Sequence, residues 1–219
     1  PGAHDLLRGG LAEPFTLGDY AVVVGSRADR SGIYALEGVD LFNLLCLPGV
    51  TDAGILADAV AYCQERRAFL IVDPPETADR PEEIGALAAG TAFPKSDHAA
   101  VYYPWVQVAD PLANGRLRLS APSGTVAGLF ARTDATRGIW KAPAGTDATL
   151  NGVQALAYRL TEREQGTLNP IGVNALRVLP VFGAVAWGAR TLRGADAMAS
   201  EYKYVPVRRL ALYLEESLY

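Results

Sequence analysis

The sequence predicts an α/β fold, with a mixed sheet of parallel strand-helix-strand units that are flanked by helices and extended by antiparallel hairpins. Through the middle of the chain, short apolar runs alternate with stretches whose apolar residues recur at helical spacing, which is typical of α/β folds. At two other places turn residues separate short apolar runs, which indicates hairpins. Apolar residues make up 50% of the 219 residues. The sheet can therefore be covered on both faces.

Residues 21–25, Ala-Val-Val-Val-Gly, form the first apolar run, and we expect a buried strand there. Residues 26–32 are charged and predict a solvated loop. A phosphate-binding loop would also follow a strand, but this one lacks the Gly-Lys-Ser/Thr ending that places a lysine on phosphates, and Asp29 would repel them. We expect no nucleotide site.

Residues 41–47 and 69–72 are apolar runs that end in turn residues, and they predict neighbouring parallel strands. Between them lies a helix that Thr51 or Asp52 can cap. One stripe of this helix is apolar and consists of Ile55, Leu56, Ala59, Val60 and Cys63, whereas Asp58, Gln64 and Glu65 point away. Together these elements form one strand-helix-strand unit, which is right-handed by default.

A second helix is predicted to begin near Pro81, with Glu82 and Glu83 at its positive end, and to stop at residues 93–94. Its inner side carries Ile84, Leu87 and Ala88. The next strand spans residues 99–108. Pro104 interrupts that run, which favours an edge strand or a bulge.

The signal changes after residue 111. Asn114-Gly115 predicts a hairpin turn before an alternating strand at residues 117–119, and Pro122-Ser123 introduces a helix. The inner side of that helix carries Val126, Ala127, Leu129 and Phe130. A second hairpin is expected from residues 173–179 and 184–189, with its turn at Pro180 and Gly183.

Composition excludes several functions. The net charge is −4 and the pI is near 5.2. No excess of Lys and Arg exists to neutralise phosphates, so we expect no nucleic-acid partner. The apolar runs are far shorter than the roughly 20 residues of a membrane helix and no signal sequence opens the chain, so we expect no membrane insertion. The chain starts without Met and stops within a helical pattern, which suggests a piece of a longer protein.

The metal-binding residue types are sparse. Cys46 lies in an apolar strand and Cys63 on the apolar side of a helix, so both are interpreted as reduced core thiols. The histidines, His4 and His98, have no cysteine at ligand spacing. We expect no metal site and no cofactor.

Asp73, His98 and Ser123 occur in the Asp-His-Ser order of subtilisin-type proteases, so a serine hydrolase is an alternative. In that family the serine lies in a Gly-Thr-Ser-x-Ala turn. Residues 124–127 here read Gly-Thr-Val-Ala, and a valine cannot attack a carbonyl. We therefore interpret Asp73 as a turn former, Ser123 as a helix cap and His98 as a loop residue, and we expect no catalytic residues.

Other chemistry-bearing residues have simpler interpretations. The possible carboxylate pairs are expected to be surface charge near helix ends: Asp52 and Asp58 with Glu65, and Glu82 with Glu83. Tyr102, Tyr103 and Trp105 form an aromatic cluster that is expected to fill core and cover an edge, with an interface patch as the alternative.

Several segments resemble the sheath proteins of contractile phage tails and related injection systems. Asn174 to Arg177 fits the family pattern Asn-x-Ile/Leu-Arg, and residues 183–192 fit Gly-x-x-x-Trp-Gly-Ala-Arg-Thr-Leu. The other similar segments stand in the family's order, at residues 32–48, 103–105 with 108–111, 121–124 with 126–128 and 131–134, 138–145, and 204–210. The resemblance thus covers most of residues 32–219.

The resemblance implies a structural subunit that polymerises helically around an inner tube and contracts to drive the tube through a target envelope. It implies other sheath subunits, an inner tube protein and a baseplate as partners, and a place in a virion tail or similar particle assembled in the bacterial cytoplasm. It further implies that residues 1–200 are the conserved core, named subtilisin-like in this family, with 1–31 as a lead-in, and that 201–219 begin a C-terminal domain. A generic α/β binding module is the remaining alternative.

Two strand arginines, Arg177 and Arg190, lie among these segments. Pairing with a nearby carboxylate that fixes the hairpin is the preferred interpretation for each. Contact across a subunit boundary is the alternative.

Overall fold

The computed structural model describes residues 17–193 and 200–218, and the chain divides into two units, Pro1–Leu41 and Phe42–Tyr219. In the first unit, helix α2 spans Leu17–Val23 and the 3-10 helix η1 spans Gly32–Gly38. Between them, residues 26–31 form an exposed turn, as their charge predicts.

The strand expected at residues 21–25 is wrong, because Ala21 to Val23 belong to α2. The amide of Val24 donates to the carbonyl of Tyr20, which is the bond of a helical turn, and the Val22 side chain is 74% exposed. Gly25, at φ +70°, ends the helix, and a Cβ there would lie 2.3 Å from the Ser31 carbonyl oxygen. The close return of the loop therefore requires glycine at this position.

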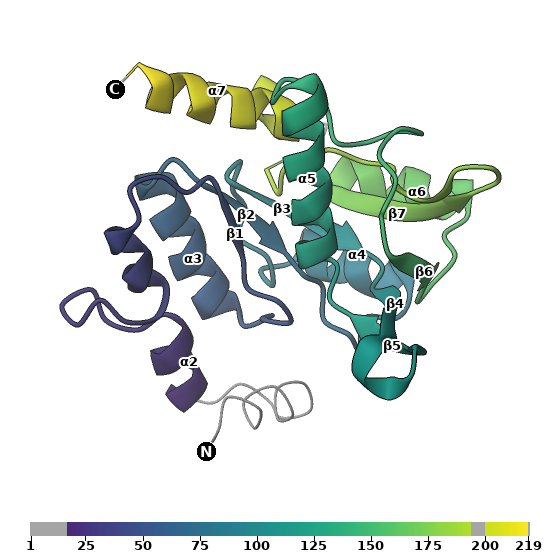
Figure 1. The fold of residues 1–219 in the computed structure, drawn as a ribbon, viewed down its shortest axis with the longest axis horizontal. Coiled ribbons are helices and arrows are strands. Elements are labelled where there is room, and N and C mark those ends of the chain that lie inside the picture. The colour runs from purple at the N-terminus through teal and green to yellow at the C-terminus, as the bar shows by residue number, and fades with distance from the viewer. Residues whose placement is uncertain (1–16, 194–199, 219) are drawn as a thin grey trace. The chain divides into compact units, whose positions relative to one another are not determined.

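In the second unit, a five-stranded sheet has the order β1-β2-β3-β7-β8 (Figure 1). Strands β1 (Leu44–Cys46), β2 (Phe69–Val72), β3 (Ala99–Tyr103) and β7 (Val173–Leu179) are parallel neighbours, and β8 (Gly183–Ala186) closes an antiparallel hairpin with β7. Every residue of β2 and β3 is buried. The predicted parallel unit and hairpin are confirmed, although β8 ends at Ala186 and not at residue 189.

Helices cover both faces of this sheet. α5 (Ser123–Arg137) and α7 (Val205–Ser217) cover one face, where they share a core cluster with alternate strand residues. That cluster includes Phe69, Ile71, Ala100, Tyr102, Val126, Phe130, Leu176 and Leu212. It contains no residue of α3 (Ala53–Glu65), α4 (Pro81–Ala89) or α6 (Glu162–Leu168). Because side chains alternate between the faces of a sheet, these three helices belong to the opposite face.

The helix starts follow the sequence. Asp52 caps α3, where its Oδ1 accepts from the Ile55 amide at 2.9 Å, and every residue of the predicted apolar stripe is buried, with Tyr62 in addition. α4 begins at Pro81 and ends at Ala89, four residues before the predicted stop. The sequence did not predict α6, which Thr161 and Glu164 open with a reciprocal capping box.

The predicted strand at residues 99–108 is two strands in two sheets. β3 lies at the centre of the first sheet and not at an edge, and β4 (Val106–Asp110) is the central strand of a second sheet of order β5-β4-β6. Pro104 lies between them, where no strand pairing needs the amide hydrogen that proline lacks. An irregular register does occur nearby, between Gln107 and Val108 in the pairing of β4 with β6 (Val153–Leu156).

β5 (Arg116–Ser120) pairs with β4 in an antiparallel hairpin whose turn contains Asn114 at φ +54° and Gly115 at φ +77°. This confirms the turn predicted from Asn-Gly. The aromatic cluster is core, as expected: Tyr102, Tyr103 and Trp105 are at most 6% exposed.

α7 lies beside α5 (Figure 1), and an ion pair with low exposure joins the two helices. Arg209 Nη1 and Nη2 donate to the two carboxylate oxygens of Asp134 at 2.9 and 2.5 Å, and the guanidinium lies 4.8 Å from the centre of the Phe130 ring. The Arg209 side chain is 3% exposed and that of Asp134 is 26% exposed. A bidentate pair of this kind fixes both position and orientation.

We predict that Asp134→Ala lowers the free energy of unfolding by about 3 kcal/mol, because it leaves the Arg209 charge buried without a partner. Urea unfolding measures the change. The matched control is Asp147→Ala, which breaks the more exposed pairs with Arg137 and Lys141 and should cost less than about 1 kcal/mol. Equal losses for the two variants would contradict a structural role for the Arg209 pair.

Candidate functional site

The residues of the protease-like order do not meet at one site. Ser123 Oγ donates to Asp73 Oδ2 at 2.7 Å, the Ser123 amide donates to Asp73 Oδ1 at 2.7 Å, and the Gly49 amide donates to Asp73 Oδ2 at 3.1 Å. A nucleophilic serine needs a base that accepts its proton. Here the Ser123 hydroxyl donates a hydrogen bond to the Asp73 carboxylate, which also accepts from the amides of Ser123 and Gly49.

His98 is engaged elsewhere. Its Nδ1 lies 2.7 Å from Asp97 Oδ1, and its Nε2 lies 2.8 Å from Arg208 Nη2. Because a guanidinium can only donate, Nε2 accepts and Nδ1 carries the proton that is donated to Asp97. Both ring nitrogens are therefore occupied away from Ser123. His98 lies in a turn before β3, as expected, but it is buried.

Two of the structural interpretations need correction. Ser123 is not the capping residue of α5, because Pro122 occupies the N-cap position and Ser123 is the first helical residue. Asp73 is more than a turn former, because its carboxylate caps α5 from the end of β2. Burial raises the pKa of the Asp73 carboxyl, although the bonds from Ser123 and Gly49 oppose that shift. The cap joins elements that are far apart in sequence.

The family-like segments around Asn174 and residues 187–192 form a polar junction beside the hairpin. The fully buried Asn174 side chain donates from Nδ2 to the carbonyls of Val101 (3.1 Å) and Arg190 (2.7 Å) and accepts at Oδ1 from the Arg190 amide (2.6 Å). It thereby fills all but one of the hydrogen-bonding positions of a primary amide. Strands β3 and β7 are tied to the chain that follows the hairpin.

Gly188 is required by this junction. A Cβ at Gly188 would lie 2.8 Å from Asn174 Oδ1, closer than a side-chain carbon approaches, and 3.0 Å from Asn174 Cα, which is also a tight contact. The Asn174 bonds and the glycine of the Trp-Gly-Ala-Arg segment therefore depend on each other.

The same segment holds the start of α7. The Thr191 amide donates to the Lys203 carbonyl, Thr191 Oγ1 donates to the Tyr202 carbonyl at 2.9 Å, and the Val205 amide donates to the Ala189 carbonyl. The Leu192 amide donates to the Ala99 carbonyl in β3 at 2.7 Å. Residues 187–192 therefore connect the central strands to α7.

The two strand arginines have different surroundings. Arg177 Nη1 donates to the amide oxygen of Gln165 in α6 at 3.3 Å, so the carboxylate partner expected for it is wrong. Arg190 lies outside the strands, and its guanidinium is 5.6 Å from the centre of the Tyr204 ring. Both contacts link the hairpin region to a neighbouring helix or to the start of α7.

Of the suggested carboxylate pairs, Asp52, Glu65, Glu82 and Glu83 are exposed and Asp58 is half-buried, with Asp52 and Glu83 serving helix caps. Cys46 and Cys63 are free thiols, and burial raises the pKa of each to about 12.

Within residues 17–193 and 200–218, no group of three or more His, Cys, Asp or Glu side chains could hold a metal ion. The helices in these residues are too short or too polar to span a bilayer. His4 lies outside the described residues.

We predict that the Asp73 cap contributes to stability. Asp73→Ala should lower the free energy of unfolding by about 3 kcal/mol, because buried donors lose their acceptor, whereas Ser123→Ala removes one hydrogen bond and should cost about 1 kcal/mol. Asp52→Ala, at the exposed cap of α3, is the control and should cost about 1 kcal/mol. An Asp73→Ala loss no larger than this control, measured by urea unfolding, would argue against the cap.

We also predict that stability depends on His98 near pH 6. Burial and the Arg208 charge lower the pKa of His98, with Asp97 opposing them. The folded state therefore favours the neutral ring, and stability should fall as pH drops below the unfolded value of about 6.5 towards the folded pKa. Unfolding measured from pH 7.5 to 5 should show this fall, and His98→Gln should reduce it. If the pH dependence of stability were unchanged in His98→Gln, groups other than His98, such as His4, would be its cause.

Comparison with known proteins places these features in a family. A family model described as the phage tail sheath protein central domain matches residues 23–192. A prophage major tail sheath protein of Pseudomonas aeruginosa (strain UCBPP-PA14) is 31% identical over 177 residues, which are 77% of this chain and 44% of that protein. A tail sheath protein of Vibrio phage KVP40 is 33% identical over 106 residues, 48% of this chain and 15% of that protein. The chain thus spans less than half the length of these relatives.

Solved structures agree. The sheath of the extracellular contractile injection system PVC in its contracted state has a TM-score of 0.66 and 32% identity, with 84% of this chain and 48% of that chain covered. The helical sheath of the anti-feeding prophage in its contracted state has a TM-score of 0.65 and 31% identity, with 94% and 51% covered. The mixed sheet with its added hairpins is the fold of these sheaths. The chain belongs to the phage tail sheath protein family, and residues 23–192 correspond to its central domain.

Proposed function

We propose that this chain is part of a structural subunit of a contractile tail sheath. In this proposal the subunits polymerise helically around an inner tube and contract to drive that tube through a target envelope. Family membership and the similarity to contracted sheaths support it. The observation that carries the proposal is the match of the family model to residues 23–192, within which residues 187–192 form hydrogen bonds to the chain itself, from Arg190 to Asn174 and from Thr191 to Tyr202.

The proposal includes the partners and the place of assembly. Other copies of the subunit, an inner tube protein and a baseplate are the partners, and neither nucleic acid nor a membrane is bound by this chain. The particle is a phage tail or a similar injector, assembled in the bacterial cytoplasm. A structure of the anti-feeding prophage baseplate contains a chain with 27% identity and a TM-score of 0.65, which supports the baseplate partner.

Within the subunit, we assign residues 1–200 to the core domain, with 1–31 as its lead-in, and residues 201–219 to the start of a C-terminal domain. The bonds from Thr191 and Val205 to the chain around residues 189–203 would then join these two domains. Such a joint suits subunits that move as rigid bodies when the lattice changes. Head-to-tail contacts between identical subunits produce the open helix that a sheath requires.

The proposed subunit is not an enzyme. The Asp73–Ser123 bond and the separate partners of His98 support this, because the histidine of the protease-like order contacts Asp97 and Arg208 and not the serine. Serine-reactive probes should leave Ser123 unlabelled under conditions that label a serine protease. Labelling at Ser123, located by mass spectrometry, would favour the hydrolase instead.

We predict that the complete protein, expressed with its tube protein, forms striated tubes visible by negative-stain electron microscopy. The tubes should occur in a long narrow form and a short wide form, because energy is stored in a metastable lattice in place of a bound nucleotide. Tube protein expressed alone is the control. A complete protein that stays dispersed in the presence of assembled tubes would contradict a sheath function.

A further inference from the structure

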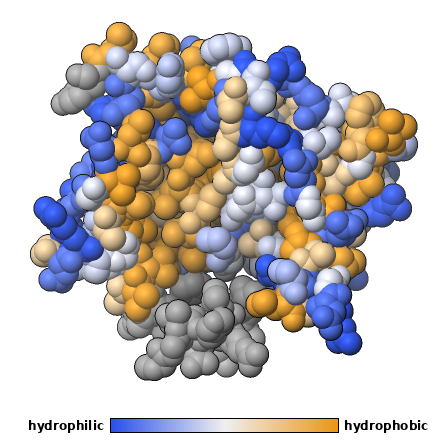
Figure 2. All heavy atoms as spheres, viewed as in Figure 1, coloured by the Kyte–Doolittle hydropathy of each residue, from blue (hydrophilic) through white to orange (hydrophobic). Residues whose placement is uncertain are grey.

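The β4–β5 hairpin presents leucines and arginines to solvent. Leu112, Leu117 and Leu119 are 92%, 53% and 37% exposed. Leu117 and Leu119 alternate with Arg116 and Arg118 along β5, which is an edge strand with every one of these four residues exposed. Figure 2 shows hydrophobic and hydrophilic surface side by side over this hairpin, at the lower right. Residues 111–120 contain two arginines and no acidic residue.

The hairpin arginines have no acidic partner within the described part of the chain. Neither Arg116 nor Arg118 forms an ion pair there, although Asp110 lies opposite Arg116 in the β4–β5 register. The Asp110 carboxylate instead accepts from the Leu112 amide at 2.9 Å. The surface therefore combines apolar area with an excess of positive charge, two arginines against one aspartate.

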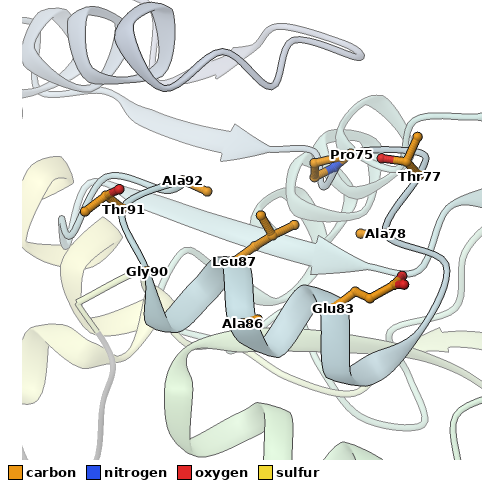
Figure 3. Close-up of a pocket in the computed structure, with 9 residues that line it drawn as sticks. All are labelled: Pro75, Thr77, Ala78, Glu83, Ala86, Leu87, Gly90, Thr91 and Ala92. Carbon is orange, nitrogen blue, oxygen red and sulfur yellow. The ribbon is translucent and has the colours of Figure 1, made fainter.

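A groove beside α4 has the opposite character (Figure 3). Its volume is about 550 Å³, and it lies between α4, the loop after β2 and residues 90–92. Leu87 points from α4 into the space between Pro75 and Ala92, and Ala78 and Ala86 add further apolar surface. Thr77 and Thr91 lie at its two ends. The groove can receive apolar side chains of leucine size.

The rim of this groove is acidic. Glu83 lines the groove, and the exposed Glu76 and Asp79 flank its lining residues Thr77 and Ala78; the one arginine in residues 75–92 is Arg80. Arg80 contacts Asp79 at 3.9 Å, which leaves an excess of negative charge. The pKa of Tyr103 is raised, chiefly by burial, and the negative charges of Asp79 and Glu83 are among the smaller causes. Opposite charges around matching apolar surfaces favour association and fix its register.

We propose that the β4–β5 hairpin of one copy of this chain docks in the α4 groove of a second copy. Leu117 and Leu119 would enter the groove, and Arg116 and Arg118, on the opposite face of the edge strand, would reach around that edge to the acidic rim with their long side chains. Within one copy these leucines are exposed, so its own groove does not hold them. Because the two surfaces differ, the contact is heterologous, and where its rotation does not close into a ring it repeats from copy to copy as an open helix. This contact deepens the proposed sheath function and rests on it.

Cysteine cross-linking between two separately labelled batches tests the contact. One batch carries Leu119→Cys in the hairpin and the other carries Ala86→Cys, an exposed position in the groove wall. The native thiols give little background, because burial raises the pKa of Cys46 and Cys63 to about 12. Mixing under mild oxidation should give a disulfide between the two variants, identified by mass spectrometry.

The control batch carries Thr136→Cys in place of Ala86→Cys. Thr136 is exposed near the far end of α5, about 20 Å along that helix from the end of β5. The hairpin-to-groove disulfide should exceed the control disulfide by about tenfold, the ratio that a difference of 1.4 kcal/mol in association produces. Equal yields from the two mixtures would overturn the proposal.

Charge exchange gives an independent test. Arg116→Glu with Arg118→Glu in the hairpin batch should remove the excess cross-linking, and Glu76→Arg with Asp79→Arg in the groove batch should restore it. Arg137→Glu, another exposed arginine, should leave the yield unchanged. The charge complementarity would be contradicted if the hairpin variants left the disulfide yield unchanged. It would also be contradicted if they lowered the yield and the groove variants did not restore it.

Electron microscopy of the complete protein separates this inference from the proposed function. If the Arg116→Glu, Arg118→Glu protein still forms striated tubes at the concentration that the unaltered protein requires, the docking contact is wrong and the sheath function stands. If the unaltered complete protein forms no tubes around its tube protein, the sheath function itself fails, whatever the disulfide yields.

Discussion

The buried amide of Asn174 is the interaction on which the arrangement of the second unit depends. Parallel strands β3 and β7 pair with each other, but the chain that leaves the hairpin must also return beside them with its backbone groups satisfied. Asn174 provides both a donor and an acceptor to Arg190 and a second donor contact to Val101. Without that side chain, buried peptide groups would lack partners, each at a cost of roughly 1–3 kcal/mol. The sheet, the hairpin and the start of α7 are therefore joined at one side chain.

A second anchor lies at the C-terminal end of β2. Asp73 follows β2 and holds the first turn of α5, and Arg209 holds the last part of α5 to α7. α5 is thus fixed near both ends, at its first residue by a carboxylate from β2 and at Asp134 by a guanidinium from α7. Between those points its buried residues, Val126, Leu129 and Phe130, pack on the sheet. Two polar contacts and one apolar face leave this helix little freedom to shift independently of the sheet.

The sequence predicted those elements whose signals are local. The strands at residues 69–72 and 173–179, the capped helix after Asp52 and the Asn-Gly turn each depend on residues close together in the chain, and each is confirmed. The run at 21–25 misled, because valines favour strands wherever they occur, whereas the hydrogen bond from Val24 to Tyr20 shows a helical turn. Pro104 was noticed, but hydrophobicity continues across it, so the change of sheet gave no local signal.

The site was harder to predict because its contacts are long-range. Asp73 and Ser123 are 50 residues apart, and Arg209 and Asp134 are 75 apart, distances at which a single sequence gives no indication of pairing. Asn174 did offer a signal, since an asparagine within a buried parallel strand needs hydrogen-bond partners. The sequence showed the family segments without showing that Gly188 exists to make room for Asn174.

The positions of these anchors bear on how a force applied to α7 would be carried. α7 is linked to α5 through Arg209 and to residues 189–192 through the Val205 and Thr191 bonds, and residues 189–192 are in turn linked to β3 through Leu192. These links act in parallel, so separation of α7 from the sheet requires several of them to break together, whereas a single tether would fail alone. Loops and ends open at low free energy because few such contacts hold them. A subunit in the proposed sheath that is displaced as one body needs several parallel links at the joint between its domains. The residues of the family segments form these links.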